Sequence, residues 1–336
     1  MIAARIVQDL MRRIRFLELQ RWHKSRLPRT APQLRRPDEI FDLFAGTSSG
    51  ALVVLGMVQP EPVSPEGISE MFRRKAAEIF PPNRFSATGA VKQAFSAKYD
   101  AAPLERVFKD LYGDIRLSEC RANTLIAAYD TDHRSPFYFK NYSPRVCNAK
   151  PELCREGGQY RDFFLRDVAR ATTAAPTYFE PAHITATDEK TYTLMDGGLV
   201  ANNPALSAYV EARKIYRDAR QYVIISIGTG RSSRMYQWED IKKWGYLDWV
   251  SPFNGSPINA MFTDGQSESV AHSLTQLPRV TYFRLNADLP NTVKEEMDDS
   301  REENMEAIEH MARQIIRSHR EELHRIALLL YRHRLL

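Results

Sequence analysis

The sequence predicts a layered α/β fold in which helices cover both faces of a central sheet. Strand-like apolar runs alternate with helix-like amphipathic segments along the 336 residues, and this alternation is typical of an α/β/α architecture. Residues 222–227 are almost continuously apolar, as expected for a strand buried on both faces of a parallel sheet. Residues 41–55 contain a strand, a sharp turn and a helix in immediate succession.

The first predicted element is an amphipathic helix at the N-terminus. Its apolar residues recur at helical spacing: Ile6, Val7, Leu10, Met11, Ile14 and Leu17. Arg5 and Asp9 interrupt the apolar stretch, which therefore lacks the pattern of a signal peptide. No run approaches the roughly 20 apolar residues that span a bilayer. We therefore expect a cytoplasmic protein whose contact with membrane, if any, is peripheral.

The turn at residues 46–50 has the pattern G-x-S-x-G and carries the candidate nucleophile, Ser48. Such a turn exposes the serine oxygen at the N-terminus of the following helix, where backbone amides such as that of Ser49 can stabilise negative charge. Gly46 and Gly50 are expected because the strained turn leaves little room for side chains. A plain connection or an anion site is the alternative. An α/β-hydrolase is disfavoured, because its nucleophile follows several strands.

The residues after this turn predict the surrounding scaffold. Ser64 caps a predicted helix that continues to Phe80 and ends at Pro81 and Pro82. The other expected elements are helices at residues 101–112, 163–173 and 203–216, strands at 124–129 and 136–140 around a turn at 130–132, and a loop at 141–161.

A candidate general base follows the predicted strand at residues 191–195. Asp196 stands at the end of this strand, and Gly197 and Gly198 allow another segment to approach it closely. A carboxylate in this setting suits proton abstraction. A simple Asp-Gly turn is the alternative.

Two later segments have distinct compositions. Residues 231–262 are rich in aromatic residues and predict an acyl-chain channel, a mobile lid over Ser48 or a loop that covers the core. Residues 297–336 predict long helices in which Glu303, Glu306 and Glu309 are exposed. Residues 326–330 are expected to pack on a partner surface or to face a membrane. We expect one domain over residues 1–336, with a core at about 1–290 and a C-terminal helical arm at about 297–336.

The three cysteines give no metal-binding or C-x-x-C spacing. Their sparse, odd number predicts free thiols in a reducing compartment, and pairing of Cys147 with Cys154 is the alternative. No pattern in the sequence calls for a metal or an organic cofactor.

Four motifs in order along the chain resemble the patatin-like phospholipases, serine lipid acyl hydrolases with a Ser-Asp dyad. These motifs are Gly-Thr-Ser-Ser-Gly at 46–50, Ala-Thr-Thr-Ala-Ala-Pro-Thr-Tyr-Phe at 171–179, Asp-Gly-Gly at 196–198 with Asn-Asn-Pro at 202–204, and Ser-Ile-Gly-Thr-Gly at 226–230. The resemblance covers nearly the whole chain. It implies a three-layer fold with a mostly parallel sheet, Ser48 as nucleophile and Asp196 as base, with Gly197 and Gly198 supporting the aspartate.

The resemblance also implies a chemistry without histidine. Phospholipids or other glycerolipids are the implied substrates, and their fatty-acyl esters would be cleaved through an acyl-enzyme on Ser48. The eight histidines stand in unrelated contexts and are expected to be structural or superficial. His272 is the one rival base that we retain for testing.

One family element does not occur in this sequence. The family begins with a strand and a glycine-rich D-G-G-G-x-R-G turn that forms the oxyanion hole, whereas this sequence begins in the helix that would follow. One interpretation places the first strand and the turn upstream of residue 1. The other is a catalytically impaired membrane- or partner-binding module, because losing even one oxyanion donor costs about 10² to 10³ in rate.

Basic residues concentrate near both ends of a chain with a formal net charge of +5. The first cluster comprises Arg12, Arg13, Arg15, Arg21, Lys24, Arg26, Arg29, Arg35 and Arg36, and the second comprises Arg317, Arg320, Arg325, Arg332 and Arg334. The first cluster either docks on anionic lipid head groups or forms a solvated helix face and linker. Nucleic-acid binding is disfavoured, because no binding motif accompanies the charge. The sequence does not indicate an oligomeric state.

Overall fold

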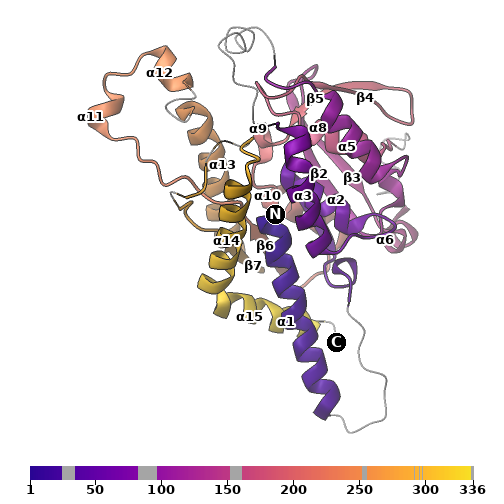
Figure 1. The fold of residues 1–336 in the computed structure, drawn as a ribbon. Coiled ribbons are helices and arrows are strands. Elements are labelled where there is room, and N and C mark those ends of the chain that lie inside the picture. The colour runs from indigo at the N-terminus through magenta and orange to yellow at the C-terminus, as the bar shows by residue number, and fades with distance from the viewer. Residues whose placement is uncertain are drawn as a thin grey trace.

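Figure 1 shows the fold of the chain in a computed structural model. The structure describes residues 1–24, 35–81, 97–151, 161–251, 256–290, 292–294, 296 and 298–333. Five residues named in the sequence predictions lie outside these ranges: Arg26, Arg29, Pro82, Cys154 and Arg334.

The helices and strands alternate along the described residues. The helices are α1 (Ile2–Lys24), α2 (Ser49–Val58), α3 (Pro65–Ile79), α5 (Ala102–Tyr112), α6 (Pro144–Ala149), α8 (Leu165–Thr172), α9 (Gly198–Ala201), α10 (Ala205–Ile215), α11 (Trp238–Ile241), α12 (Tyr246–Val250), α13 (Pro257–Gln276), α14 (Glu302–Ser318) and α15 (Arg320–His333), with short 3₁₀ turns at Pro37–Glu39 and Leu117–Glu119. The strands are β1 (Leu43–Thr47), β2 (Asn123–Asp130), β3 (Ser135–Asn141), β4 (Ala182–Thr185), β5 (Thr191–Asp196), β6 (Tyr222–Ile227) and β7 (Val280–Leu285).

The strands pair in two groups. Four strands follow the order β1-β2-β5-β4, and β3 also pairs with β2. The second group is the pair β6-β7. In the larger group the pair β1-β2 is parallel, whereas β3, β4 and β5 enter through antiparallel pairs, so this sheet is mixed. The pair β6-β7 is parallel. β2 lies between β1 and β5 and is buried along nearly its whole length, as a central strand should be.

Helices pack around these strands in layers (Figure 1). α2 and α8 contact the strands of the larger group, and α5 and α3 lie outside them. α10 contacts both β1 and β6, and α13 contacts β7. The predicted α/β class and three-layer α/β/α arrangement are confirmed.

Most of the predicted local elements are also confirmed. The hydroxyl of Ser64 caps α3 by accepting a hydrogen bond from the amide of Gly67 at 3.1 Å. Two predictions about residues 141–161 are wrong. The expected loop contains helix α6, whose N-terminal proline is compatible with a first helical turn. Cys147 is disulfide-bonded, although free thiols were expected, and Cys120 is free and buried.

The C-terminal helices pack on the chain itself. α1 contacts both α14 and α15. Ile326 and Ala327 are fully buried and belong to the same hydrophobic cluster as Ile6 and Leu10 of α1. The expectation that residues 326–330 face a partner or a membrane is therefore wrong for this buried pair, because α1 already covers it.

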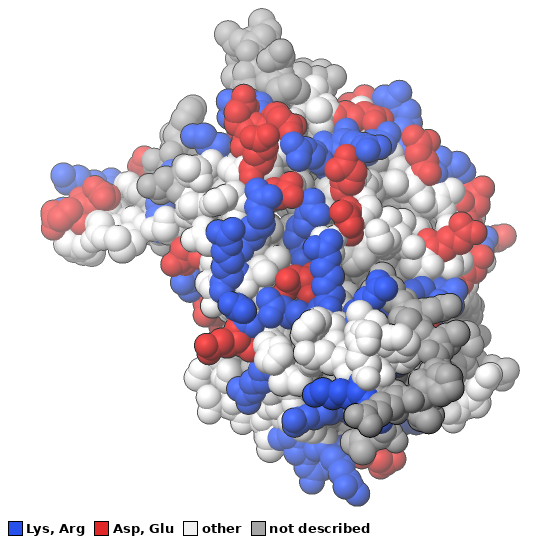
Figure 2. Space-filling model, turned by 60° about the horizontal axis from the view of Figure 1, so that its bottom comes forward, with Lys and Arg blue, Asp and Glu red and all other residues white. Residues whose placement is uncertain are grey.

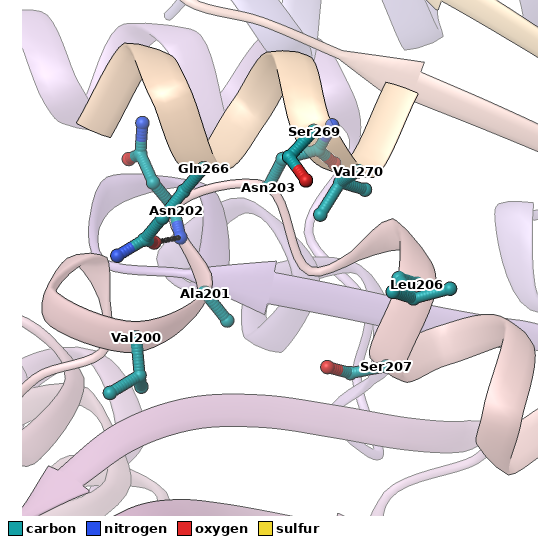
Figure 3. Close-up of a pocket in the computed structure, with 9 residues that line it drawn as sticks. All are labelled: Val200, Ala201, Asn202, Asn203, Leu206, Ser207, Gln266, Ser269 and Val270. Carbon is teal, nitrogen blue, oxygen red and sulfur yellow. Dashed lines mark hydrogen bonds between the residues drawn. The ribbon is translucent and has the colours of Figure 1, made fainter. Parts of the chain in front are cut away.

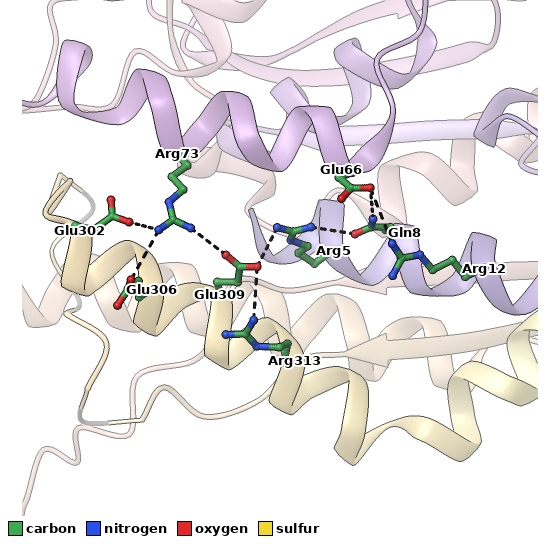
Figure 4. A network of polar contacts seen from close by, with 9 residues as sticks. All are labelled: Arg5, Gln8, Arg12, Glu66, Arg73, Glu302, Glu306, Glu309 and Arg313. Carbon is green, nitrogen blue, oxygen red and sulfur yellow. Dashed lines mark hydrogen bonds and ion pairs between the residues drawn. The ribbon is translucent and has the colours of Figure 1, made fainter.

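A network of ion pairs joins α1, α3 and α14 (Figure 4). Glu309 of α14 accepts hydrogen bonds from Arg5 at 2.9 Å and from Arg73 at 3.5 Å, and it lies 3.7 Å from Arg313. Its side chain is only 17% exposed, so the expectation that Glu309 is exposed is wrong. Glu306, by contrast, is 68% exposed.

The aromatic segment at residues 231–262 does not cover the core. None of its described residues belongs to a hydrophobic cluster of the structure. It forms α11, α12 and the start of α13, and Trp238 and Tyr246 are 69% and 81% exposed. The interpretation of this segment as a covering loop is therefore wrong.

Within the described part of the chain, every helix is too short or too polar to cross a bilayer.

We predict that α15 is an integral part of the folded core. Ile326→Ala should lower the free energy of unfolding by about 2–5 kcal/mol, because it opens a cavity at a fully buried site. The same change at Ile258, which is 45% exposed, should alter it by no more than about 0.5 kcal/mol. Denaturant unfolding followed by circular dichroism measures both values. Equal effects of the two substitutions would contradict burial of α15.

Candidate active site

The turn between β1 and α2 presents Ser48 in a strained backbone conformation. Ser48 has φ 52° and ψ −128°, and a positive φ is uncommon for a residue with a side chain. A Cβ atom on Gly46 would come within 2.6 Å of the Cα of Ala51, so only glycine lets the strand approach the helix this closely. Gly50 differs, because a Cβ atom there would meet nothing within 4 Å. The prediction that the turn leaves little room for a side chain is therefore confirmed at Gly46 and wrong at Gly50.

Asp196 is the last residue of β5 and is almost completely buried, at 6% exposure. In the sheet it lies opposite Ala128 of β2. A Cβ atom on Gly197 would come within 2.3 Å of the carbonyl oxygen of Ala127, so glycine is required where the chain leaves β5. These contacts fix the carboxylate against the central strand.

The two candidate residues meet directly. The Ser48 hydroxyl donates a hydrogen bond to Asp196 Oδ2 at 2.6 Å, although 148 residues separate them along the chain. The amide of Gly198 donates to the other carboxylate oxygen at 2.7 Å. β2 provides the alignment, because Thr47 pairs with Ala127 and Asp196 pairs with the next residue, Ala128.

Burial makes this aspartate a stronger base than an exposed one. Desolvation raises the pKa of Asp196 to about 6, and the hydrogen bonds from Ser48 and Gly198 oppose part of that rise. A carboxylate with a raised pKa attracts a proton more strongly and is still ionised at neutral pH. This combination suits a general base.

Comparison with known proteins identifies the family. The family described as "Patatin-like phospholipase" matches residues 27–209, a range that includes both Ser48 and Asp196. This chain belongs to the patatin-like phospholipase family. It is 28% identical over 290 residues to "Patatin-like protein 2" of Arabidopsis thaliana, in an alignment that covers 78% of this chain and 68% of the relative. It is 26% identical over 303 residues to "Patatin-like protein 2" of Oryza sativa subsp. indica, in an alignment that covers 80% of this chain and 72% of the relative. It is also 26% identical over 296 residues to "Patatin-11" of Solanum tuberosum, and this alignment covers 80% of this chain and 71% of the relative.

Thr172 lies outside the motifs at residues 46–50 and 196–198, yet the structure shows that it contacts the turn that carries Ser48. The hydroxyl of Thr172 accepts a hydrogen bond from the amide of Ser48 at 2.9 Å and donates to the carbonyl of Ala127 at 2.7 Å. Two residues further, the carbonyl of Ala174 accepts a hydrogen bond from the amide of Asp196 at 3.0 Å. In the sequence, residues 171–179 are recognisable only as a family motif, and nothing in the sequence predicts these contacts.

The N-terminus of α2 provides a region of positive potential beside Ser48. Ser49 is the first residue of this helix, and the amides of a first turn have no acceptor within the helix. The helix dipole adds partial positive charge at the same end. Ser49 is exposed and Ser48 is half-buried, so a substrate can approach this end of α2 from solvent.

A cavity of about 220 Å³ lies next to this site, between α13 and the segment that forms α9 and the start of α10 (Figure 3). Its wall includes Ala201, whose carbonyl accepts a hydrogen bond from the Thr47 hydroxyl at 2.7 Å. The lining residues are Val200, Ala201, Asn202, Asn203, Leu206, Ser207, Gln266, Ser269 and Val270. They include neither dyad residue and none of residues 231–262, so this cavity is not the acyl channel expected from that segment.

Among the described residues, neither a histidine nor a cluster of metal ligands is found at the dyad. The side chain of His272 is exposed on α13, and the hydroxyl of Ser48 donates its hydrogen bond to Asp196. No group of three or more His, Cys, Asp or Glu residues that could hold a metal ion occurs among the residues that the structure describes.

We predict that the Thr172 hydroxyl positions the turn at residues 46–50, which carries Ser48. Thr172→Val leaves the buried carbonyl of Ala127 and the amide of the half-buried Ser48 without their partner, which should cost about 1–3 kcal/mol of stability and slow labelling of Ser48 by a fluorophosphonate. Thr172→Ser keeps the hydroxyl and should restore the labelling rate. Thermal unfolding and labelling kinetics measure the two effects. A valine variant that is labelled at the wild-type rate would show that the hydroxyl has no positioning role.

Proposed function

We propose that this protein hydrolyses fatty-acyl esters of phospholipids or related glycerolipids. Its membership in the patatin-like phospholipase family supports a lipid acyl hydrolase. The observation that carries the proposal is the 2.6 Å hydrogen bond from the Ser48 hydroxyl, held on a strained turn, to the buried carboxylate of Asp196. This pairing joins a weak nucleophile to the base that it needs.

The first step forms the acyl-enzyme. As the Ser48 oxygen attacks the ester carbonyl, Asp196 accepts the hydroxyl proton and the new C–O bond forms. The bond to the alcohol of the lipid then breaks, and the proton on Asp196 passes to the departing alkoxide oxygen. The products of this step are the free alcohol and an acyl ester on Ser48.

The second step regenerates the enzyme. Asp196 accepts a proton from a water molecule as the water attacks the acyl carbonyl. The ester bond to Ser48 breaks, the proton returns to the serine oxygen, and the fatty acid leaves.

Negative charge on the carbonyl oxygen is stabilised by the N-terminus of α2. The amides of Ser49 and Gly50 belong to its first turn, and the open space over Gly50 leaves room for a substrate. Each preorganised donor of this kind contributes about 10² to 10³ in rate.

We predict that both members of the dyad are required for hydrolysis. Ser48→Ala and Asp196→Asn should each lower kcat/KM for a p-nitrophenyl acyl ester by at least about 10³, because one removes the nucleophile and the other the base. Ser48→Ala should lower the Tm at pH 8 by no more than a few degrees, because it removes one hydrogen bond, and Asp196→Asn should not lower it. The ionised aspartate is desolvated in the folded protein, so its replacement removes a cost of folding.

His272→Ala is the matched control for these variants and should hydrolyse the ester at the wild-type rate. Wild-type turnover in either dyad variant would contradict the proposed mechanism. Folded wild-type protein that neither hydrolyses the ester nor reacts with a fluorophosphonate at Ser48 would favour the binding-module interpretation.

A further prediction concerns the pH dependence of catalysis. Asp196 accepts a proton only when it is ionised, and its pKa is about 6. The value of kcat/KM should therefore rise about tenfold between pH 5 and pH 7 and level off above that range. Initial rates in buffers of constant ionic strength, with protein shown to be folded at each pH, measure the profile. A rate that is constant from pH 5 to pH 7 would argue against Asp196 as the base.

A further inference from the structure

Exposed apolar side chains concentrate in one part of the molecule. Thirteen large apolar residues are exposed among the described residues, and eight of them lie between residues 235 and 262. These eight form what we call the apolar arm: Met235, Trp238, Tyr246, Leu247, Val250, Ile258, Met261 and Phe262. Isolated apolar residues are normal on protein surfaces, whereas contiguous exposed apolar patches mark interaction sites.

The apolar arm is carried by a packed element. The ring of Trp244 contacts Tyr236 at 5.7 Å and Trp249 at 5.1 Å between centroids, and both pairs are edge to face. α12 also packs on α13. These internal contacts hold the segment together, yet they leave Trp238, Tyr246 and Leu247 between 69% and 81% exposed.

The apolar arm is connected to the residues that follow the dyad aspartate. α13 continues from it and contacts α9, which begins two residues after Asp196. The side chain of Gln266 donates to the carbonyl of Leu199 at 3.0 Å and accepts from the amide of Asn202 at 3.5 Å. Figure 1 places α11, α12 and α9 toward the same end of the molecule.

The charges of this segment suit a zwitterionic surface. Lys242 pairs with Glu239, and Lys243 and Asp240 lie beside this pair, so the segment presents both signs without a large excess of either. Trp and Tyr are enriched where proteins meet the interface of a bilayer, and three of the four tryptophans of the chain lie within residues 238–249.

The basic clusters of the sequence lie on a different surface from the apolar arm, and we call that surface the basic face. Figure 2 shows Lys and Arg side chains gathered on the underside of the molecule, where Figure 1 places the C-terminal half of α1 together with α15. Several of these cations are matched within the chain. Arg13 pairs with Asp9, and Arg35 pairs with Glu18, each at 2.5 Å. Arg12 lies 3.9 Å from Glu66. Pairing of this kind leaves less charge for anionic lipids.

We propose that the apolar arm docks on the surface of a zwitterionic phospholipid layer. It would hold the end of the molecule that carries Ser48 and Asp196 against that layer. The proposal rests on the proposed function, because a lipid hydrolase must reach substrate that is packed in such a layer. Insertion of aromatic and aliphatic side chains drives the contact, so salt has little effect on it.

Sedimentation with phosphatidylcholine vesicles at 0.1 M and 0.5 M NaCl tests this proposal. Replacing Trp238, Leu247 and Phe262 together by serine should weaken binding of the full-length protein at least about tenfold at both salt concentrations. The matched control is Phe16→Ser with Val210→Ser, which removes apolar side chains that are 58% and 50% exposed outside the apolar arm, and it should bind as the wild type does. Thermal unfolding verifies that both variants are folded.

Activity provides a second readout. The serine variant of the apolar arm should lose turnover of vesicle phosphatidylcholine and keep turnover of the soluble ester p-nitrophenyl butyrate. Absence of turnover of the soluble ester by the wild type would count against the proposed function alone, because vesicle binding is measured independently.

Three results would overturn the docking proposal. The first is wild-type vesicle binding by the serine variant. The second is wild-type binding only to vesicles that contain anionic lipid, with loss of binding at 0.5 M NaCl, which would assign docking to the basic face. The third is a wild-type dimer in light scattering that becomes a monomer in the serine variant without a change in vesicle binding, which would make the apolar arm a contact between copies.

Discussion

The site depends on how closely the backbones of β1, α2 and β5 approach one another around β2. Gly46 allows α2 to start almost on top of β1, and Gly197 allows the chain to pass over Ala127 as it leaves β5. Neither position has room for a Cβ atom. The strained φ of Ser48 is the cost of this geometry, and the hydrogen bonds made by Thr172 and Ala174 hold both segments in place.

The same geometry sets the electrostatics of the dyad. Asp196 is buried where water cannot fully solvate its carboxylate, and the hydrogen bonds from Ser48 and Gly198 compensate for part of the lost hydration. The pKa therefore rises to about 6, and the ionised group is a cost to the folded state at neutral pH. Stability and basicity are thus opposed at this residue, as is common where a charged group is retained for chemistry.

Different surfaces of the molecule have different chemistry. α11, α12 and the start of α13 expose apolar side chains among charged ones and lie toward the end of the molecule that contains α9, whereas α1 and α15 carry cations at the other end. Glu309 and its arginine partners tie α14 to α1 and α3, so the C-terminal helices are held to the body by charge as well as by buried apolar residues.

The sequence alone was sufficient for features that depend on local chemistry or on ordered motifs. The spacing of Ile6, Leu10 and Ile14, the cap at Ser64 and the turn at 46–50 each follow from short-range geometry, and the patatin-like family followed from four motifs in order. Tertiary structure was needed wherever distant segments meet. It decided that Thr172 contacts the turn that carries Ser48, that Glu309 is largely shielded and Ile326 buried, that the described part of residues 231–262 does not cover the core and that Cys147 is disulfide-bonded. It also placed the Ser48 hydroxyl 2.6 Å from Asp196, because the register of both strands against β2 is a property of the assembled sheet and of no single segment.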